Sequence, residues 1–103
     1  MTHIVGYQSK SATVPLLSNA SATGAQQTWP GGEGKFHCVG TFGGASVTLS
    51  FLADDGTTFV PFGADTTLAA NGVGVFYGKE GDIIKAVVSG GPPSGLYASA
   101  TQV

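Results

Sequence analysis

The stretch from Ala45 to Phe51 alternates without interruption between apolar and small polar side chains. Its odd-numbered residues are Ala, Val, Leu and Phe, and its even-numbered residues are Ser and Thr. Successive side chains of a β-strand point to opposite faces of the sheet, so this period of two predicts a strand with one face in a core. Similar short runs recur along the chain, with a turn signal about every eight to twelve residues.

The whole pattern predicts an all-β protein, an antiparallel β-sandwich or small barrel of about seven short strands with an extended N-terminal arm. No segment sustains the 3.6-residue period of an amphipathic helix. Asp54-Asp55-Gly56 and Asn71-Gly72 predict tight turns, the second of them a hairpin. β-Branched residues on both faces of the 82–88 run predict a central strand that is covered on both sides.

The first thirty residues differ in composition from the rest. Lys10 is their only charged side chain, and Ser, Thr, Ala, Gln and Asn dominate residues 18–28. A turn-rich stretch at 29–34 then predicts a boundary. We therefore expect two parts: residues 1–30 as an extended arm with short strand pieces, and residues 31–103 as the β-sandwich body. Such an arm either becomes ordered by lying on something else or remains a flexible tail, and the sequence leaves both alternatives open.

The arm contains the residues that we expect to bind a partner. They are the apolar piece of the arm and the single tryptophan at its end: Val14, Pro15, Leu16, Leu17 and Trp29. For Trp29, a role as the anchor that closes the core against the body is favoured over stacking on a ligand.

Charged residues are scarce, at 10% of the chain, against about 25% in ordinary soluble domains. A surface with so few charges predicts cover by partner subunits, with a homo-oligomer (a trimer or a dimer) as one expectation. The net charge of −2 and four scattered lysines argue against binding to nucleic acid. No window approaches the roughly 20 apolar residues of a membrane span. A secretory signal is not expected at the N-terminus, which predicts a protein made in a cytoplasm.

Residues for catalysis or metal binding do not gather in the sequence. The six carboxylates lie in predicted turns or at strand ends, and Asp54-Asp55-Gly56 lacks the spaced oxygen ligands of a calcium loop. His37 and Cys38 are neighbours on a strand, so they point to opposite faces and cannot form a shared metal site or a nucleophile pair. We therefore expect no enzymatic activity, no metal and no cofactor.

One run has the look of a known group of proteins. It reads Phe36-x-Cys38-x-Gly40-Thr41-Phe42-Gly43-Gly44-Ala45-x-Val47-x-Leu49, followed by Asp55-Gly56-Thr57-x-Phe59 and closed by Leu96-Tyr97-Ala98. Over roughly the last two-thirds of the chain this resembles the small β proteins encoded among the structural genes of tailed bacteriophages. The motifs are strand and turn positions, so no functional residue carries over.

The resemblance implies a structural role in the virion. The expectation is a capsid decoration (cement) protein on the surface of the phage head, made in the host cytoplasm, whose partner is the major capsid protein. The alternative is a carbohydrate- or receptor-binding module of a phage fibre. Its sugar-stacking aromatics would come from Tyr7, Trp29, Tyr77 and Tyr97.

Overall fold

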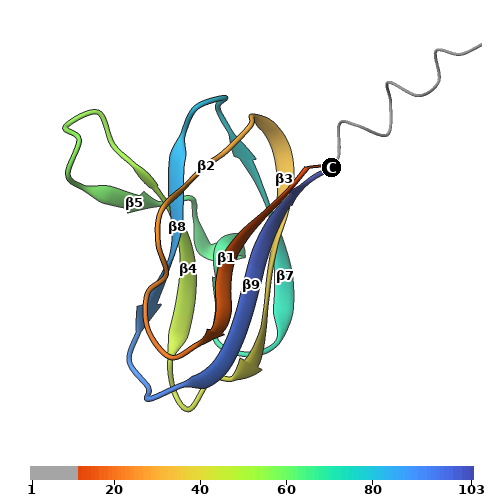
Figure 1. Ribbon diagram of the computed structural model, residues 1–103, viewed down its shortest axis with the longest axis vertical. Helices are drawn as coiled ribbons and strands as arrows, with labels where there is room; N and C mark the ends of the chain where they lie inside the picture. The colour runs from red at the N-terminus through yellow and green to blue at the C-terminus, as the bar shows by residue number, and fades with distance from the viewer. Residues whose placement is uncertain (1–11) are drawn as a thin grey trace, which may run out of the picture.

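The computed structural model describes residues 12–103, which form a two-layer β-sandwich (Figure 1). The strands are β1 (Thr13–Ala20), β2 (Gln27–Thr28), β3 (Gly32–Thr41), β4 (Ser46–Leu52), β5 (Phe59–Pro61), β6 (Thr67–Leu68), β7 (Gly72–Gly78), β8 (Ile83–Ser89) and β9 (Ser94–Gln102), with one 3-10 turn, η1 (Ala64–Thr66). One sheet has the order β1-β9-β3-β7, and the other has the order β2-β8-β4-β5 with β6 also paired to β4. Every pairing is antiparallel, so the predicted all-β sandwich is confirmed.

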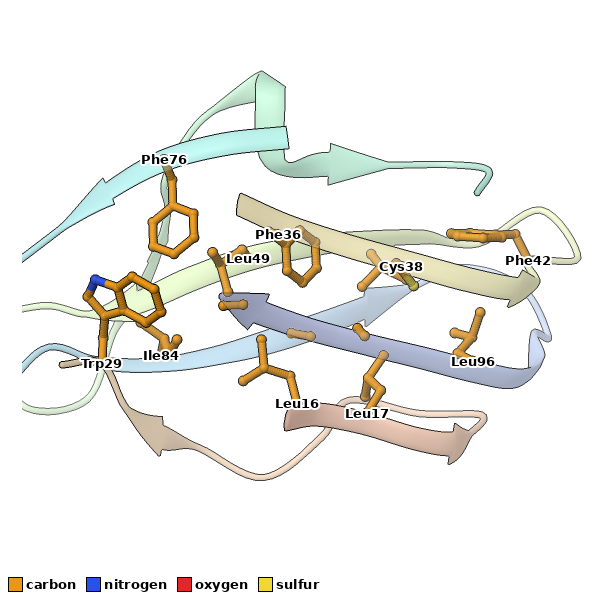
Figure 2. Packing of buried hydrophobic residues seen from close by; sticks show 14 residues of the cluster. Leu16, Leu17, Trp29, Phe36, Cys38, Phe42, Leu49, Phe76, Ile84 and Leu96 are labelled. Carbon is orange, nitrogen blue, oxygen red and sulfur yellow. The ribbon is translucent and has the colours of Figure 1, made fainter. Parts of the chain in front are cut away.

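The core lies between the two sheets and runs the length of the sandwich. Figure 2 shows it extending from Trp29 and Phe76 at one end to Phe42 at the other, with Phe36 and Leu49 between them. These large side chains leave the solvent almost completely. Because apolar burial is the main favourable term in folding, this continuous cluster holds the two layers together.

The alternation predicted from Ala45 to Phe51 is confirmed for Ala45, Val47 and Leu49, which are buried, whereas Phe51 is half-buried against the core. Ser50, predicted to face outward, is also buried, because it lies between Lys85 of β8 and Pro61 of β5.

Strand β8 is flanked by β2 and β4, as expected of a central strand. Ile84 and Ala86 are fully buried on its inner face, whereas Ile83 and Val87 are only half-buried on the outer face. The expectation that β8 is covered on both faces is therefore wrong, since its outer face keeps contact with solvent.

Asn71-Gly72 does not form the predicted hairpin. Strand β6 before it pairs with β4, and β7 after it pairs with β3 in the other sheet, so the segment carries the chain from one layer to the other. The Asn71 side-chain oxygen accepts a hydrogen bond from the Gly40 N–H at 2.9 Å, which fixes this crossing against β3. A turn signal indicates that the chain reverses, and it does not say which sheet receives the next strand.

Asp54-Asp55-Gly56 does join two paired strands, β4 and β5, as predicted. This hairpin projects from the side of the sandwich (Figure 1). The Asp55 carboxylate accepts hydrogen bonds from the N–H groups of Thr57 and Thr58 at 2.9 and 2.8 Å and from the Thr58 hydroxyl at 2.6 Å. Asp55 is thus a turn former rather than part of a calcium loop.

The described part of the predicted arm belongs to the sandwich. Strand β1 pairs along β9, and β2 pairs with β8, so residues 12–30 are built into both sheets. The boundary at residue 30 is corrected accordingly, while residues 1–11 lie outside the described part of the chain. Register shifts on either side of Leu17 let Leu16 and Leu17 both enter the core. Such bulges break the period of two by which a strand is recognised.

Candidate interaction surface

The residues expected to bind a partner are mostly used by the fold itself. Leu16 and Leu17 are each 5% exposed and Trp29 is 0% exposed, all within the core cluster. Val14 packs half-buried against the same cluster, and only Pro15 is exposed. Three of the five side chains are therefore buried in the chain's own interior and are not available to a partner.

Trp29 is seated by two glycines on neighbouring strands. A Cβ added at Gly34 or Gly78 would lie 2.6 or 2.5 Å from the indole ring, so only a glycine leaves room for it at either position. The indole N–H donates to the Gly32 carbonyl at 3.2 Å, and the ring centroid lies 4.9 Å from that of Phe76. The prediction that Trp29 closes the core is confirmed, and its burial removes it from the sugar-stacking candidates.

Exposed apolar side chains gather instead on the outer face of the four-stranded sheet. Val73, Val75 and Tyr77 alternate along β7 and are 59%, 54% and 75% exposed. Val39 of β3 lies directly opposite Tyr97 of β9 in the register, and both are exposed. We call these five residues the outer patch. Exposed apolar groups gathered on one face mark sites of protein contact more often than singly scattered ones do.

Strand β7 turns its valines outward because its inner face is crowded. A Cβ added at Gly74 would overlap the carbonyl oxygen of Asp65, where η1 packs beneath the strand. Phe76, the one inward residue of β7 that is not a glycine, packs on Trp29 and Phe62 with ring centroids 4.9 Å away in each case. The inner positions are thus set by close packing, and the β-branched residues occupy the solvent face.

β7 is also the outermost strand of its sheet, with β3 as its one hydrogen-bonded neighbour among the described strands. Its seven residues contain no charged side chain and no proline, and its register with β3 has no shift. The other outer strands are protected: β1 has Pro15 and bulges, β5 is three residues long and ends in Pro61, and β2 has two residues. Natural sheets use such devices to prevent pairing at an edge, and the described β7 carries none of them.

A groove of about 240 Å³ lies beside this edge. It is lined by residues of the η1 segment and of β7: Phe62, Gly63, Ala64, Asp65, Thr66, Val75, Phe76 and Tyr77. Its rim therefore includes an exposed aromatic ring and a residue with a carboxylate. Tyr77 pairs with Glu33 near one end of β3. Tyr97, the other exposed tyrosine, pairs with Val39 near the other end of the same strand. The two tyrosines therefore do not share a site.

Within residues 12–103, no three metal-ligating side chains lie close enough to hold a metal ion. Cys38 is fully buried, while its neighbour His37 is half-buried on the outer face of the sheet. The expected separation of these two side chains to opposite faces is confirmed. The hydrogen bonds from Thr58 and Thr57 hold the pKa of the exposed Asp55 carboxyl at about 2, and this lowered value follows from turn geometry rather than from a reactive site.

Burial raises the pKa of the Cys38 thiol from 9.0 to about 11. The folded state therefore disfavours the thiolate, so the stability of the wild type is intact below pH 9 and falls as the pH rises from 9 to 11. The loss by pH 11 is about 2–3 kcal/mol. Urea unfolding followed at pH 8 and pH 10.5 measures this loss of stability, with Cys38→Ala as the variant that lacks the contribution.

An aromatic disulfide reagent should react slowly with the native Cys38 thiol at pH 8 and at once after unfolding. Rapid labelling of the folded protein would contradict the burial of this side chain.

No helix of the described chain is both long and apolar enough to cross a bilayer. No model of a known protein family matches the sequence. The curated proteins likewise contain no significantly similar sequence.

Proposed function

We propose that this chain is a structural protein of a bacteriophage particle, a capsid decoration (cement) protein that binds the major capsid protein on the outside of the head. Such a protein stabilises a shell by bridging neighbouring capsomers, without any chemistry of its own. The observation that carries this proposal is the outer patch, a set of exposed valines and tyrosines on a rigid sheet with few charges. The resemblance of residues 36–98 to small phage structural proteins supports it.

The physical properties of the outer patch suit docking on a flat protein surface. Aromatic side chains are enriched in protein interfaces and charged side chains are depleted from their centres. Glu33 and Lys35, which pair in register with Tyr77 and Val75, are the charged outward residues on β3. The apolar residues thus have polar neighbours toward the middle of the sheet, an arrangement in which apolar contact supplies affinity and charge supplies orientation.

The proposed role predicts that the chain is present in purified virions. A 10.3 kDa band in many copies per particle supports the proposal, and its absence from the particle overturns it. Particles that lack the chain should bind the purified protein to saturation and then resist heating better.

Val39→Lys should weaken this binding by at least about tenfold, since it places a charge in the docking face. Val60→Lys, an exposed valine on the other sheet, is the matched control and should bind as the wild type does.

A carbohydrate-binding role is the second candidate, and one observation favours it. Tyr77 stands exposed beside the groove that Asp65 also lines, and a ring next to a carboxylate is an arrangement that can stack on and hydrogen-bond to a sugar. Calorimetric titration with host polysaccharide tests it, with Tyr77→Ala as the variant and Tyr97→Ala as the control. Heat of binding that Tyr77→Ala abolishes and Tyr97→Ala preserves would favour a fibre module over a cement protein.

A further inference from the structure

We propose that the β7 edge, Gly72–Gly78, pairs with the β7 edge of a second copy of this chain around a two-fold axis at Val75. The two four-stranded sheets would then form one continuous antiparallel sheet of eight strands. This inference concerns the edge and not the outer patch as a docking face, so it does not rest on the proposed function.

Strand β7 offers a regular and unprotected row of main-chain groups. The strand has no proline to remove a donor, no charge to repel a partner and no bulge in its pairing with β3. Main-chain hydrogen bonds along such an edge give affinity without charged side chains. The other outer strands of the described sandwich are short, bulged or closed by proline, so β7 is the edge open to pairing.

Strand β7 is also complementary to itself. In an antiparallel pair centred on Val75, the outward face sets Val75 against its own copy and Val73 against Tyr77. Pairs of aromatic and β-branched residues are favourable cross-strand neighbours. On the inward face Gly74 lies opposite the partner's Phe76, whose ring stays packed on Trp29 and Phe62 of its own copy. Gly72 and Gly78 then pair at the two ends, and the whole strand is used.

The charges next to the edge permit this arrangement. Lys35 pairs with Val75, so the Lys35 side chains of the two copies would be separated by three strand spacings, about 14 Å. This distance exceeds the Debye length of about 8 Å at physiological ionic strength, so their repulsion is largely screened. Glu33 pairs with Tyr77, and His37 pairs with Val73. Because Tyr77 of one copy faces Val73 of the other, Glu33 of one copy and His37 of the other would lie on the same line across the joined sheet. The partner that these features fit is therefore an identical edge rather than a charged peptide.

Sedimentation of the full chain over a range of concentrations tests the proposal. The wild type should shift with rising concentration from 10.3 kDa to twice that mass. Val75→Lys should raise the dimer dissociation constant by at least about tenfold, because it opposes two like charges at the axis. Val39→Lys, on the same face but one strand inward, should leave the dimer intact. A wild type that stays monomeric, a trimer, or equal loss of dimer in both variants would overturn the edge pairing.

Disulfide trapping tests the register. In the proposed pair, Val75→Cys places two thiols opposite one another at a Cα separation of about 4.5–5.5 Å, within the range of a disulfide. Val73→Cys places them four residues apart along the strands, about 14 Å, and beyond reach. Mild oxidation should therefore cross-link Val75→Cys alone, and the buried native Cys38 does not interfere. Equal or absent cross-linking of the two variants overturns the register. Binding of either variant to particles is measured separately, so this result does not decide the proposed function.

Discussion

Removal of residues 1–28 is expected to leave a chain that does not fold. The deletion takes away β1 and β2, and with them Leu16 and Leu17 from the core and the strand that covers β9. Truncation of one buried leucine to alanine lowers the free energy of unfolding by about 2–5 kcal/mol in comparable cores. Since the whole stability of a domain is about 5–15 kcal/mol, the remaining segment cannot hold the sandwich together.

Circular dichroism and the emission of Trp29 measure this outcome. In the folded chain Trp29 is fully buried, so its emission maximum moves to longer wavelength when the core opens. The shorter deletion of residues 1–11 is the control, because it removes none of the residues of the described core. Native-like spectra from the 29–103 fragment would contradict this prediction, because they would show that the body folds without β1 and β2.

Leu49→Asp is expected to unfold the chain, whereas Val87→Asp is expected to leave it folded. Leu49 is fully buried between the sheets, and a carboxylate there has no hydrogen-bond partner to replace water. Burying such a group costs several kcal/mol, a large part of the total stability. Val87 lies on the neighbouring strand β8, half-buried on the outer face and opposite Thr48. Its carboxylate remains hydrated, so the cost should be on the order of 1 kcal/mol.

Urea unfolding of the two variants separates these cases. Val87→Asp should show a cooperative transition at a slightly lower midpoint than the wild type, and Leu49→Asp should show none. If both variants are soluble and fold cooperatively, the inner face assigned to β4 is refuted. If both fail to fold, the outer face of β8 is more tightly covered than its half-buried side chains indicate.

The sequence predicts the elements of this fold well where one face of a strand is distinctly apolar. The run from Ala45 to Phe51 gives β4 and most of its inward residues, and Trp29 is correctly expected in the core. These predictions succeed because burial acts locally on each strand and leaves its period in the sequence. The turn at Asp55 is predicted for a similarly local reason, because the side chain bonds to the backbone two and three residues later.

The pairing of the strands could not be predicted in the same way. Asn71-Gly72 encodes a reversal of the chain, and only the packing of the whole sandwich decides that the next strand joins the other sheet. The sequence does not identify β1 as part of the body, because its bulge sets Leu16 and Leu17 on the same side. A local irregularity of this kind depends on the neighbouring strand, and the sequence of β1 alone does not contain that information.

The candidate interaction surface is missed for a related reason. Along β7 the glycines face the core and the valines face the solvent, the opposite of what the hydrophobicity of the side chains alone would predict. The signal that could have found it is the set of glycines itself. Gly74 and Gly78 mark where the Asp65 backbone and the Trp29 ring approach too closely for a side chain. Glycines repeated on one face of a strand often indicate such an approach.

The position of β9 affects the order in which this protein can assemble. Ser94–Gln102 lies between β1 and β3, so the first long strand of the sandwich meets its sheet only through the last one. A nascent chain on the ribosome therefore leaves the facing edges of β1 and β3 unpaired until β9 has emerged. Pairing over so long a sequence separation makes folding slow, and unpaired strand edges can aggregate meanwhile. The yield of soluble protein should therefore depend on conditions during synthesis, such as temperature and chaperone supply, more than the small size of the domain suggests.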